Sequence, residues 1–494
     1  MNKPLRRVAL ACLLLFGLLM LNANYVQFVR ADDVTNDAGN RRLLLGEYSR
    51  ERGPILVGGQ PVAESVATPD ELKYLRQYPG GPLYAHVTGF YSFVYGAEGI
   101  ERTSREVLAG TDDRLFVGRM ADLLTGDQER GGSVVLTLDP AAQQAALDAL
   151  EGQVGAVTAI DPQTGAILAM VSNPSYDPSP LASHDATVVS DAWEALNADP
   201  ARPMLNRSLR ESYPPGSTFK IITAAAALST GAYDPETELY APRALPFDEI
   251  DYTLPNQGGA ACAADETATL REALRISCNT AFANLGNELG ARAVREQAER
   301  FGFNATVDVP MTSAESAFPG VPAEAGEDFD PDSLNDPQLA QSSIGQLNVR
   351  ATPLQMAMVV AGIANDGVVM RPYLVQETRA PDLAPLETTE PEELSEAVTP
   401  EVAAQLRGML VTVVEDGTGS NAQISGVTVG GKTGTAQTAP GRAPYAWFVS
   451  FAPEEDPQVA VAVLIEQAAV AADDVSGGRI AAPIARAVME AVLE

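Results

Sequence analysis

The stretch Tyr213-Pro-Pro-Gly-Ser-Thr-Phe-Lys220 places a serine and a lysine within one helical turn. Two prolines and a glycine end any preceding element, and Ser217 stands where a helix N-cap is favoured. A helix over residues 218–228 would bring Lys220 beside Ser217, because positions three apart share one face. A lysine can take the proton of a serine hydroxyl only when its pKa, ordinarily about 10.4, is lowered by burial or by a second cation. The stretch therefore predicts a serine nucleophile with a lysine base.

Lysine is rare in this chain, which makes the one at position 220 more informative. The 33 basic residues comprise 29 arginines and four lysines, which are Lys3, Lys73, Lys220 and Lys432. Arginine keeps its proton at neutral pH, so it cannot replace lysine as a base. The alternative is a chance Ser-x-x-Lys pattern on an ordinary helix.

Length, composition and charge restrict the class of protein. The chain has 494 residues, which suggests two or three domains. Its 46% hydrophobic and 20% charged residues are typical of a globular protein. The net charge of −32 is spread along the chain, which argues against nucleic acid and against a basic membrane-surface patch.

The N-terminus is an export segment. Residues 1–7 are basic and residues 8–21 are apolar. A helix over residues 8–29 would be about 33 Å long, which is enough to cross a bilayer. The positive residues then stay in the cytoplasm, so residues 1–30 are interpreted as cytoplasmic tail and single-pass anchor, with the rest of the chain outside the cell membrane. The alternative is a signal peptide cleaved at the poor site 29–31, and we favour the uncleaved anchor.

Cysteine and histidine are scarce. In an oxidising exterior Cys262 and Cys278 could form a disulfide, and two free thiols are an equal alternative. The two histidines, His86 and His184, have no suitable third residue nearby in sequence, which disfavours a Ser-His-Asp triad and favours structural or surface roles. No metal-ligand pattern is present, and we expect no metal and no cofactor.

Residues 31–130 form a small mixed α/β region without a nucleophile pattern, which we interpret as a non-catalytic pedestal. A polar linker leads to a helix over residues 40–53, which is followed by a strand. Short strands, including residues 84–91, and a helix over residues 99–108 complete the pedestal.

Residues 131–494 form the second region, in which strands from both ends flank a helical part. Asp139 is the expected N-cap of its first helix. The region opens at residues 133–139. The expected strands span residues 155–161, 166–172, 427–438, 446–451 and 458–465, and they would join in one antiparallel sheet that the first and last helices cover. The expected helices span residues 140–150, 270–289, 291–301, 353–365, 398–416 and 480–493. The acidic, proline-rich residues 381–391 are interpreted as a surface loop.

Ser277-Cys-Asn279 lies within a helical pattern at an expected break between two helices. Serine and asparagine two apart do not share a helix face, so both reach one place only if the backbone turns there. Taken alone, such a pattern is usually a turn or a cap.

The segment Gly430-Gly-Lys-Thr-Gly-Thr435 predicts a strand that another backbone or a ligand approaches closely, because glycine inside a strand leaves room for such contact. On an edge strand the free amide of Thr435 could donate to an oxyanion. The alternative is a glycine-rich turn with an incidental lysine. This alternative is disfavoured because Lys432 is the one lysine of this region besides Lys220.

Ser-x-x-Lys, Ser-x-Asn and Lys-Thr-Gly occur in this order in penicillin-binding proteins and serine β-lactamases. From residue 133 to its C-terminus the chain resembles that superfamily. With its anchor and short pedestal it is similar to class B penicillin-binding proteins, and the segment 50–55 is most similar to the penicillin-binding protein A group of actinobacteria. The resemblance implies an α+β transpeptidase domain over residues 131–494, with a five-stranded antiparallel sheet between helices and a helical subdomain. One departure is Cys278, where β-lactamases often have aspartate.

The resemblance also implies a reaction. The substrate would be a peptidoglycan stem peptide ending in D-Ala-D-Ala, and Ser217 would attack the penultimate carbonyl while Lys220, kept neutral with the help of Lys432, accepts its proton. The backbone amides of Ser217 and Thr435 would bind the oxyanion. The other expected site residues are Ser277 for proton relay, Asn279 for orienting the peptide, and Thr433, Gly434 and Thr435 for binding the terminal carboxylate. A second amine would take the acyl group in a cross-link made during growth and division, and a β-lactam would acylate Ser217.

Two further interpretations stay open. One is a serine β-lactamase or D,D-carboxypeptidase, which would need a group that activates water for deacylation. The other is a non-catalytic sensor or division scaffold that binds partners through residues 40–130. The pedestal is too short for a glycosyltransferase, so the resemblance implies a membrane glycosyltransferase or a divisome or elongasome protein as partner.

Overall fold

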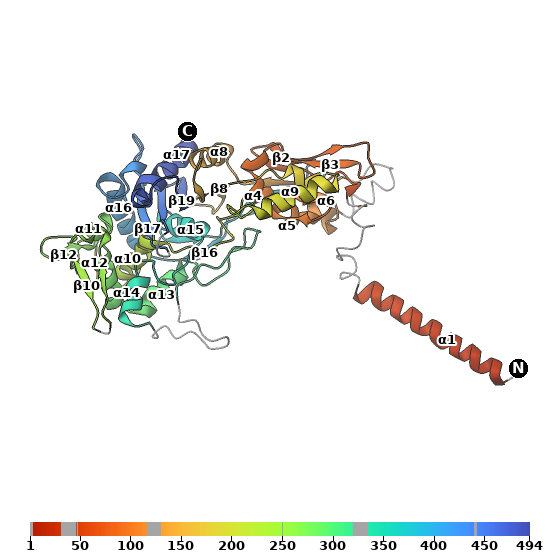
Figure 1. The fold of residues 1–494 in the computed structure, drawn as a ribbon, viewed down its shortest axis with the longest axis horizontal. Helices are drawn as coiled ribbons and strands as arrows, with labels where there is room; N and C mark the ends of the chain where they lie inside the picture. Colours follow the sequence, from red (N-terminus) through yellow and green to blue (C-terminus); the bar gives the residue numbers. More distant parts are fainter. Residues whose placement is uncertain are drawn as a thin grey trace.

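The computed structural model describes residues 3–30, 46, 48–115, 130–248, 250–319, 334–438 and 442–494. Helix α1 (Lys3–Asn24) stands apart from a pedestal that carries β2 and β3 and from a larger C-terminal part that carries β17, β19 and α17 (Figure 1).

A five-stranded antiparallel sheet forms the centre of the C-terminal part, in the order β17-β18-β19-β7-β8. Its strands come from both ends of the region, as the sequence predicts, and are β7 (Val154–Ile160), β8 (Ile167–Asn173), β17 (Gly430–Ala436), β18 (Tyr445–Ala452) and β19 (Val459–Gln467). Most residues of the inner strands are buried on both faces, so helices must cover both sides.

Helices cover the two faces of this sheet. The first and last helices of the region, α8 (Pro140–Ala149) and α17 (Ala482–Leu493), pack together over one face, and Asp139 caps α8 by accepting from the amide of Ala142 at 2.8 Å. On the other face lies α15 (Pro353–Ala364), all of whose residues are buried. The predicted α+β fold with an antiparallel sheet between helices is confirmed.

The helical part adjoins α15 and supplies the walls of the site. Its helices are α10 (Lys220–Ser229), α11 (Leu270–Arg275), α12 (Asn279–Leu289), α13 (Ala291–Arg300), α14 (Asp336–Ser342) and α16 (Pro400–Asp416). Two small antiparallel strand pairs accompany them, β9 (Glu238–Tyr240) with β12 (Thr267–Thr269), and β10 (Ala244–Pro246) with β11 (Thr253–Pro255).

A six-stranded sheet joins the pedestal to the C-terminal part, in the order β15-β14-β6-β1-β2-β3. The pedestal supplies β1 (Ile55–Val57), β2 (Gln60–Ala67) and β3 (Tyr74–Gln77), and the chain beyond residue 130 supplies β6 (Ser133–Leu136), β14 (Val375–Arg379) and β15 (Pro385–Thr388). The expected boundary at residue 130 therefore runs through a sheet to which both sides contribute.

Short helices and small strand pairs complete the two parts. The helices are α4 (Ala85–Thr88), α5 (Gly99–Thr103), α6 (Arg105–Ala109) and α9 (Ala186–Ala198), and the strand pairs are β4 (Tyr91–Ser92) with β5 (Gly96–Ala97) and β13 (Val368–Met370) with β16 (Glu393–Glu396).

A buried ion cluster holds the pedestal together. The carboxylate of Glu101, which has no exposed surface, accepts from Arg52 Nε and Arg76 Nε at 2.6 Å each. The two guanidinium groups lower the pKa of Glu101 against the opposing effect of burial. The charge of Glu101 is therefore compensated inside the pedestal core.

Two local expectations are wrong. Residues 84–91 are not a strand, because a helical turn, α4, occupies residues 85–88 and ends at Gly89, whose φ of +70° is not helical. Residues 381–391 are not only a loop, because β15 pairs with β14 there. Proline and acidic residues are tolerated in β15 because it is the edge strand of its sheet. Of the helix expected over residues 40–53, residues 40–45 and 47 lie outside the described residues. Its expected end is wrong, because the described residues after Tyr48 are not helical and Glu51 forms a β-bridge with Arg130.

The segment Lys3–Gln27, which comprises helix α1 and the residues directly after it, is long and apolar enough to cross a membrane. None of the side chains of α1 is buried. Such a segment near the N-terminus fits an anchor or a signal sequence.

Candidate active site

The segment 213–220, which we call the nucleophile turn, lies between the residues that precede α15 and the edge strand β17. Tyr213 exchanges backbone hydrogen bonds of 2.9 and 2.8 Å with Ala351, and the indole of Trp447 donates to the Pro214 carbonyl at 2.9 Å. The turn is fixed at Gly216, whose φ is +55° and where a Cβ would lie 2.8 Å from the Thr435 carbonyl oxygen. The backbone of the turn is thus in contact with β17.

The helix begins differently from the expectation. A 3-10 turn, Gly216–Phe219, precedes α10, so Ser217 lies inside a helical turn and does not cap the helix with its side chain. The hydroxyl that bonds back to the chain is that of Thr218, which donates to the Pro215 carbonyl at 2.8 Å. Among the described residues the Ser217 hydroxyl has no hydrogen-bond partner, which leaves its oxygen available to a substrate.

Lys220 lies one turn after Ser217 and is fully buried. Its Nζ donates to the Ser277 carbonyl at 2.7 Å, to Asn279 Oδ1 at 2.7 Å and to Ser277 Oγ at 3.3 Å. All three acceptors are uncharged, so burial and then the charge of Lys432 hold the pKa of Lys220 well below its usual range.

Lys432 contacts the hydroxyl of the same serine. Its Nζ donates to Ser277 Oγ at 2.9 Å and to the Thr433 carbonyl at 3.0 Å, and burial lowers its pKa to about 7. The Ser277 hydroxyl thus contacts two amines that lose their protons more readily than ordinary lysines.

Ser277 and Asn279 meet Lys220 because the backbone turns between them. Ser277 has a φ of +63°, which is rare for a residue with a side chain, and it separates α11 from α12. The break between helices that the sequence predicts is therefore present. It brings both side chains to one amine despite their spacing of two.

Strand β17 carries the Lys-Thr-Gly segment along the edge of the sheet. In an antiparallel pair the N–H and C=O of one residue point to the same edge of the strand. The Thr435 carbonyl faces Gly216, so the Thr435 amide also faces the nucleophile turn. Gly434 lets the turn approach, because a Cβ there would lie 2.8 Å from the Pro215 carbonyl oxygen.

The hydroxyl of Thr433 is paired with that of Thr418 at 2.7 Å. Thr418 follows α16 and has no recognisable pattern around it in the sequence. Only the tertiary fold shows that Thr418 adjoins the Lys-Thr-Gly segment.

A cleft of about 640 Å³ opens over the nucleophile, and we call it the nucleophile cleft. Ser217, Asn279 and Thr435 line it, together with Tyr252, the turn 256–259, Gln341, Gln346 and Gln437. Among the described residues that line it, none has a carboxylate side chain.

Cys262 and Cys278 are joined in a disulfide with an S–S distance of 2.00 Å. Of the two alternatives that the sequence leaves open, the structure has the paired one. The bond ties the middle residue of the Ser-x-Asn segment to the loop that precedes β12.

Both histidines have structural contacts and neither lines the nucleophile cleft. His86 is buried, with Nε2 2.8 Å from the Pro203 carbonyl oxygen, and burial lowers its pKa to about 4. His184 Nδ1 lies 2.6 Å from Asp70 Oδ2.

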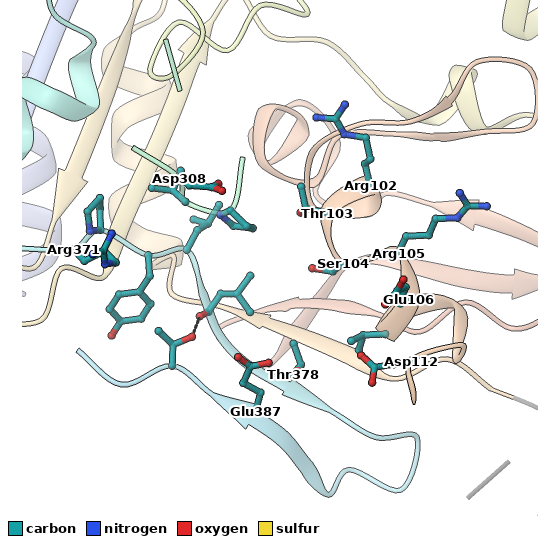
Figure 2. A pocket seen from close by; sticks show the side chains of 18 of the residues that line it. Arg102, Thr103, Ser104, Arg105, Glu106, Asp112, Asp308, Arg371, Thr378 and Glu387 are labelled. Carbon is teal, nitrogen blue, oxygen red and sulfur yellow. Dashed lines mark hydrogen bonds between the residues drawn. The ribbon is translucent and has the colours of Figure 1, made fainter. Parts of the chain in front are cut away.

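A larger cleft, of about 770 Å³, lies where the pedestal meets the C-terminal part. Figure 2 shows charged side chains of both signs around it, from the pedestal (Arg102, Arg105, Glu106) and from the C-terminal part (Asp308, Arg371, Glu387). No residue of the three motifs lines this junction, so its size does not make it the catalytic site.

A serine beside a buried lysine of low pKa, a second such lysine and an edge strand of a five-stranded sheet define a serine acyl-transfer enzyme of the penicillin-binding type. Residues 155–490 match the model of the penicillin binding protein transpeptidase domain, and residues 52–134 match that of the penicillin binding protein A dimerisation domain. The chain belongs to the penicillin-binding protein transpeptidase family.

Individual relatives agree with this assignment. The chain is 47% identical to peptidoglycan D,D-transpeptidase PbpA of Mycolicibacterium smegmatis, in an alignment that covers 100% of this chain and 99% of the relative. It is 45% identical to PbpA of Mycobacterium tuberculosis, with the same two shares of coverage. The structure of penicillin-binding protein A from M. tuberculosis as its ceftriaxone acyl-enzyme matches with a TM-score of 0.86 and 45% identity, over 91% of this chain and 100% of that chain. The predicted resemblance to this group is confirmed.

Proposed function

We propose that the protein is a membrane-anchored peptidoglycan D,D-transpeptidase that forms an acyl-enzyme on Ser217. The observation that carries the proposal is the burial of Lys220, which lies one turn after Ser217. Its pKa is lowered, and its amine contacts both Ser277 and Asn279. The relatives are named peptidoglycan D,D-transpeptidases, and two solved relatives are β-lactam acyl-enzymes.

In the first step Ser217 Oγ attacks the carbonyl carbon of the penultimate D-Ala in a stem peptide ending in D-Ala-D-Ala. The hydroxyl proton goes to Lys220, which is able to accept it because burial disfavours its charged form. The developing oxyanion accepts hydrogen bonds from the amides of Ser217 and Thr435, and one such donor is worth about 3 kcal/mol in a comparable site.

The bond from the carbonyl carbon to the terminal D-Ala nitrogen then breaks. Ser277, which is 2.9 Å from Lys432 Nζ and 3.3 Å from Lys220 Nζ, passes the proton to the leaving amine. Asn279 orients the peptide, while Thr433, Gly434 and Thr435 receive the terminal carboxylate.

In the second step the amine of another stem peptide attacks the ester on Ser217, and the serine leaves with a proton as the cross-link forms. The described lining of the nucleophile cleft contains no carboxylate that could activate water, which favours transfer to an amine over hydrolysis. β-Lactams mimic the dipeptide and acylate the same serine.

Covalent labelling tests the proposal. The purified ectodomain should bind a fluorescent penicillin, and mass spectrometry should locate the adduct on Ser217. Ser217→Ala should abolish the label, whereas Ser229→Ala, at the exposed end of α10, should keep it. An unlabelled wild type would leave the non-catalytic sensor or scaffold as the better interpretation. Rapid turnover of nitrocefin would instead favour a β-lactamase.

The apolar helix α1 supports the anchor, with the N-terminus in the cytoplasm and the catalytic part outside the membrane. The matched families are a transpeptidase domain and a dimerisation domain. Glycan strands would therefore be polymerised by a partner, a membrane glycosyltransferase of the division or elongation machinery.

A further inference from the structure

The start of α12 lacks the side-chain cap that such a helix usually has. The first backbone N–H groups of a helix have no partner within it, and Ser, Thr, Asn or Asp at the N-cap commonly accepts from one of them. Here the N-cap residue is Cys278, which makes no capping hydrogen bond and whose sulfur is bonded to Cys262. The acceptor for these amides must come from elsewhere in the chain.

Asn256 supplies that acceptor from the loop after β11. Its Oδ1 accepts from the backbone amides of Asn279 and Thr280 at 3.0 Å each, and from the Thr280 hydroxyl at 3.3 Å. The Asn256 side chain is buried.

The other half of the same amide holds the loop. Asn256 Nδ2 donates to the Pro242 carbonyl at 3.3 Å and to the Ala260 carbonyl at 3.1 Å. The side chain of Asn256 therefore has its donors and its acceptor engaged within the protein, and it is not available to a substrate.

These contacts lie directly after Ser277, whose left-handed backbone conformation is strained. A left-handed serine persists only where its surroundings hold it. On its N-terminal side Ser277 N donates to Leu274 O at 3.2 Å, and on its C-terminal side the acceptor of Asn256 fixes the amide of Asn279. The Asn279 side chain then donates to the Pro255 carbonyl at 3.3 Å and accepts from Lys220 at 2.7 Å.

We infer that Asn256 is a positioning residue for acyl transfer, which caps α12 from another loop and so holds Ser277 and Asn279 against Lys220. The inference rests on the proposed function, since it concerns the rate at which Ser217 is acylated. Asn256 adjoins the nucleophile cleft, but its side-chain amide is engaged by protein groups, so it acts through its neighbours.

The experiment compares Asn256→Ala and Asn256→Asp with wild type in penicillin acylation, in protein whose disulfide is intact by mass and which is folded at the assay temperature. Displacing catalytic groups by about 1 Å can cost about 100-fold in rate, so Asn256→Ala should lower the first-order acylation constant about 10- to 100-fold. Asn256→Asp keeps the acceptor oxygen and loses the donated bonds, so its acylation constant should lie between those of wild type and Asn256→Ala. If Asn256→Ala does not fold, the decrease in Asn256→Asp alone decides.

Asp139→Ala is the matched control, because it removes a helix cap from α8, which does not line the nucleophile cleft. It should lower the melting temperature and leave acylation unchanged. The inference is overturned if folded Asn256 variants acylate as fast as wild type, if only the binding constant changes, or if Asp139→Ala slows acylation equally. Failure of the wild type to be labelled would overturn the proposed function instead.

Discussion

Lys220 and Lys432 both place their amines on the hydroxyl of Ser277, at 3.3 and 2.9 Å. Neither lysine has exposed surface, and no carboxylate contacts either amine among the described residues. A buried ammonium without an anionic partner is costly, so burial lowers the pKa of both amines. An amine of this kind can serve as a base near neutral pH.

The acid limb of the pH profile tests this interpretation. Acylation needs neutral Lys220, so the rate should fall as the pH decreases through the lowered pKa of that lysine. Lys432→Met removes a neighbour whose charge, after burial, lowers the pKa of Lys220, so Lys220 keeps its proton to higher pH and the limb should move to higher pH. The maximal rate should also fall, because Ser277 loses a partner.

The measurement is the penicillin acylation rate from pH 5 to pH 10. Lys73→Met, the same substitution at the exposed lysine of the pedestal, should leave the limb in place. A limb that stays fixed or moves downward in Lys432→Met would contradict the electrostatic role of Lys432.

The site residues that depend on short spacings along the chain were predictable from the sequence. Ser-x-x-Lys needs one helical turn, and the break at Ser277 follows from the spacing of serine and asparagine. Asn256 was not predictable, because its bonds to Asn279 and Thr280 join residues more than twenty positions apart. An asparagine beside a proline and two glycines indicates only a turn.

At the scale of elements, strand β17 positions the site because it admits the nucleophile turn. Gly434→Ala would put a Cβ 2.8 Å from the Pro215 carbonyl oxygen and 2.9 Å from both Thr218 Cγ2 and Trp447 Cβ. The strand must then move away, which should slow acylation about 100-fold and destabilise the fold by about 1–3 kcal/mol.

Penicillin labelling and thermal melts measure these two effects. The control is Gly408→Ala in α16, where an added Cβ meets nothing within 4 Å. Alanine is favoured over glycine inside a helix by about 1 kcal/mol, so this variant should be more stable and fully labelled. Wild-type labelling of Gly434→Ala would show that β17 does not need to approach the turn.

The elements themselves were predictable where periodicity is strong, as in the central sheet and helices α8, α15 and α17. Strand β15 was missed because its proline and acidic residues are typical of a loop, and pairing with β14 is a tertiary effect. Helix α4 was missed because four residues give too short a window for a helical period.

For the whole molecule, the shared six-stranded sheet makes the pedestal depend on the chain beyond residue 130. Strand β1 pairs in parallel with β6, Ile55 opposite Val134 and Leu56 opposite Val135, and β6 pairs in turn with β14. A pedestal cut at residue 130 would expose the edge of β1 and lose part of its core.

A fragment of residues 31–130 should therefore be unfolded, whereas residues 31–494 should have native secondary structure and melt cooperatively. Circular dichroism and the dispersion of amide NMR signals distinguish the two cases. A fragment with dispersed signals and a cooperative melt would contradict the dependence and would make the pedestal an autonomous domain.

The scarcity of lysine has a practical consequence for handling the protein. Lys220 and Lys432 are enclosed, Lys3 lies in α1, and Lys73 is the exposed lysine of the pedestal. Amine-reactive dyes and sensor surfaces will therefore couple to the ectodomain at Lys73 and at its α-amino group. Coupling at Lys73 attaches the molecule through its pedestal and leaves the buried amines of Lys220 and Lys432 unmodified.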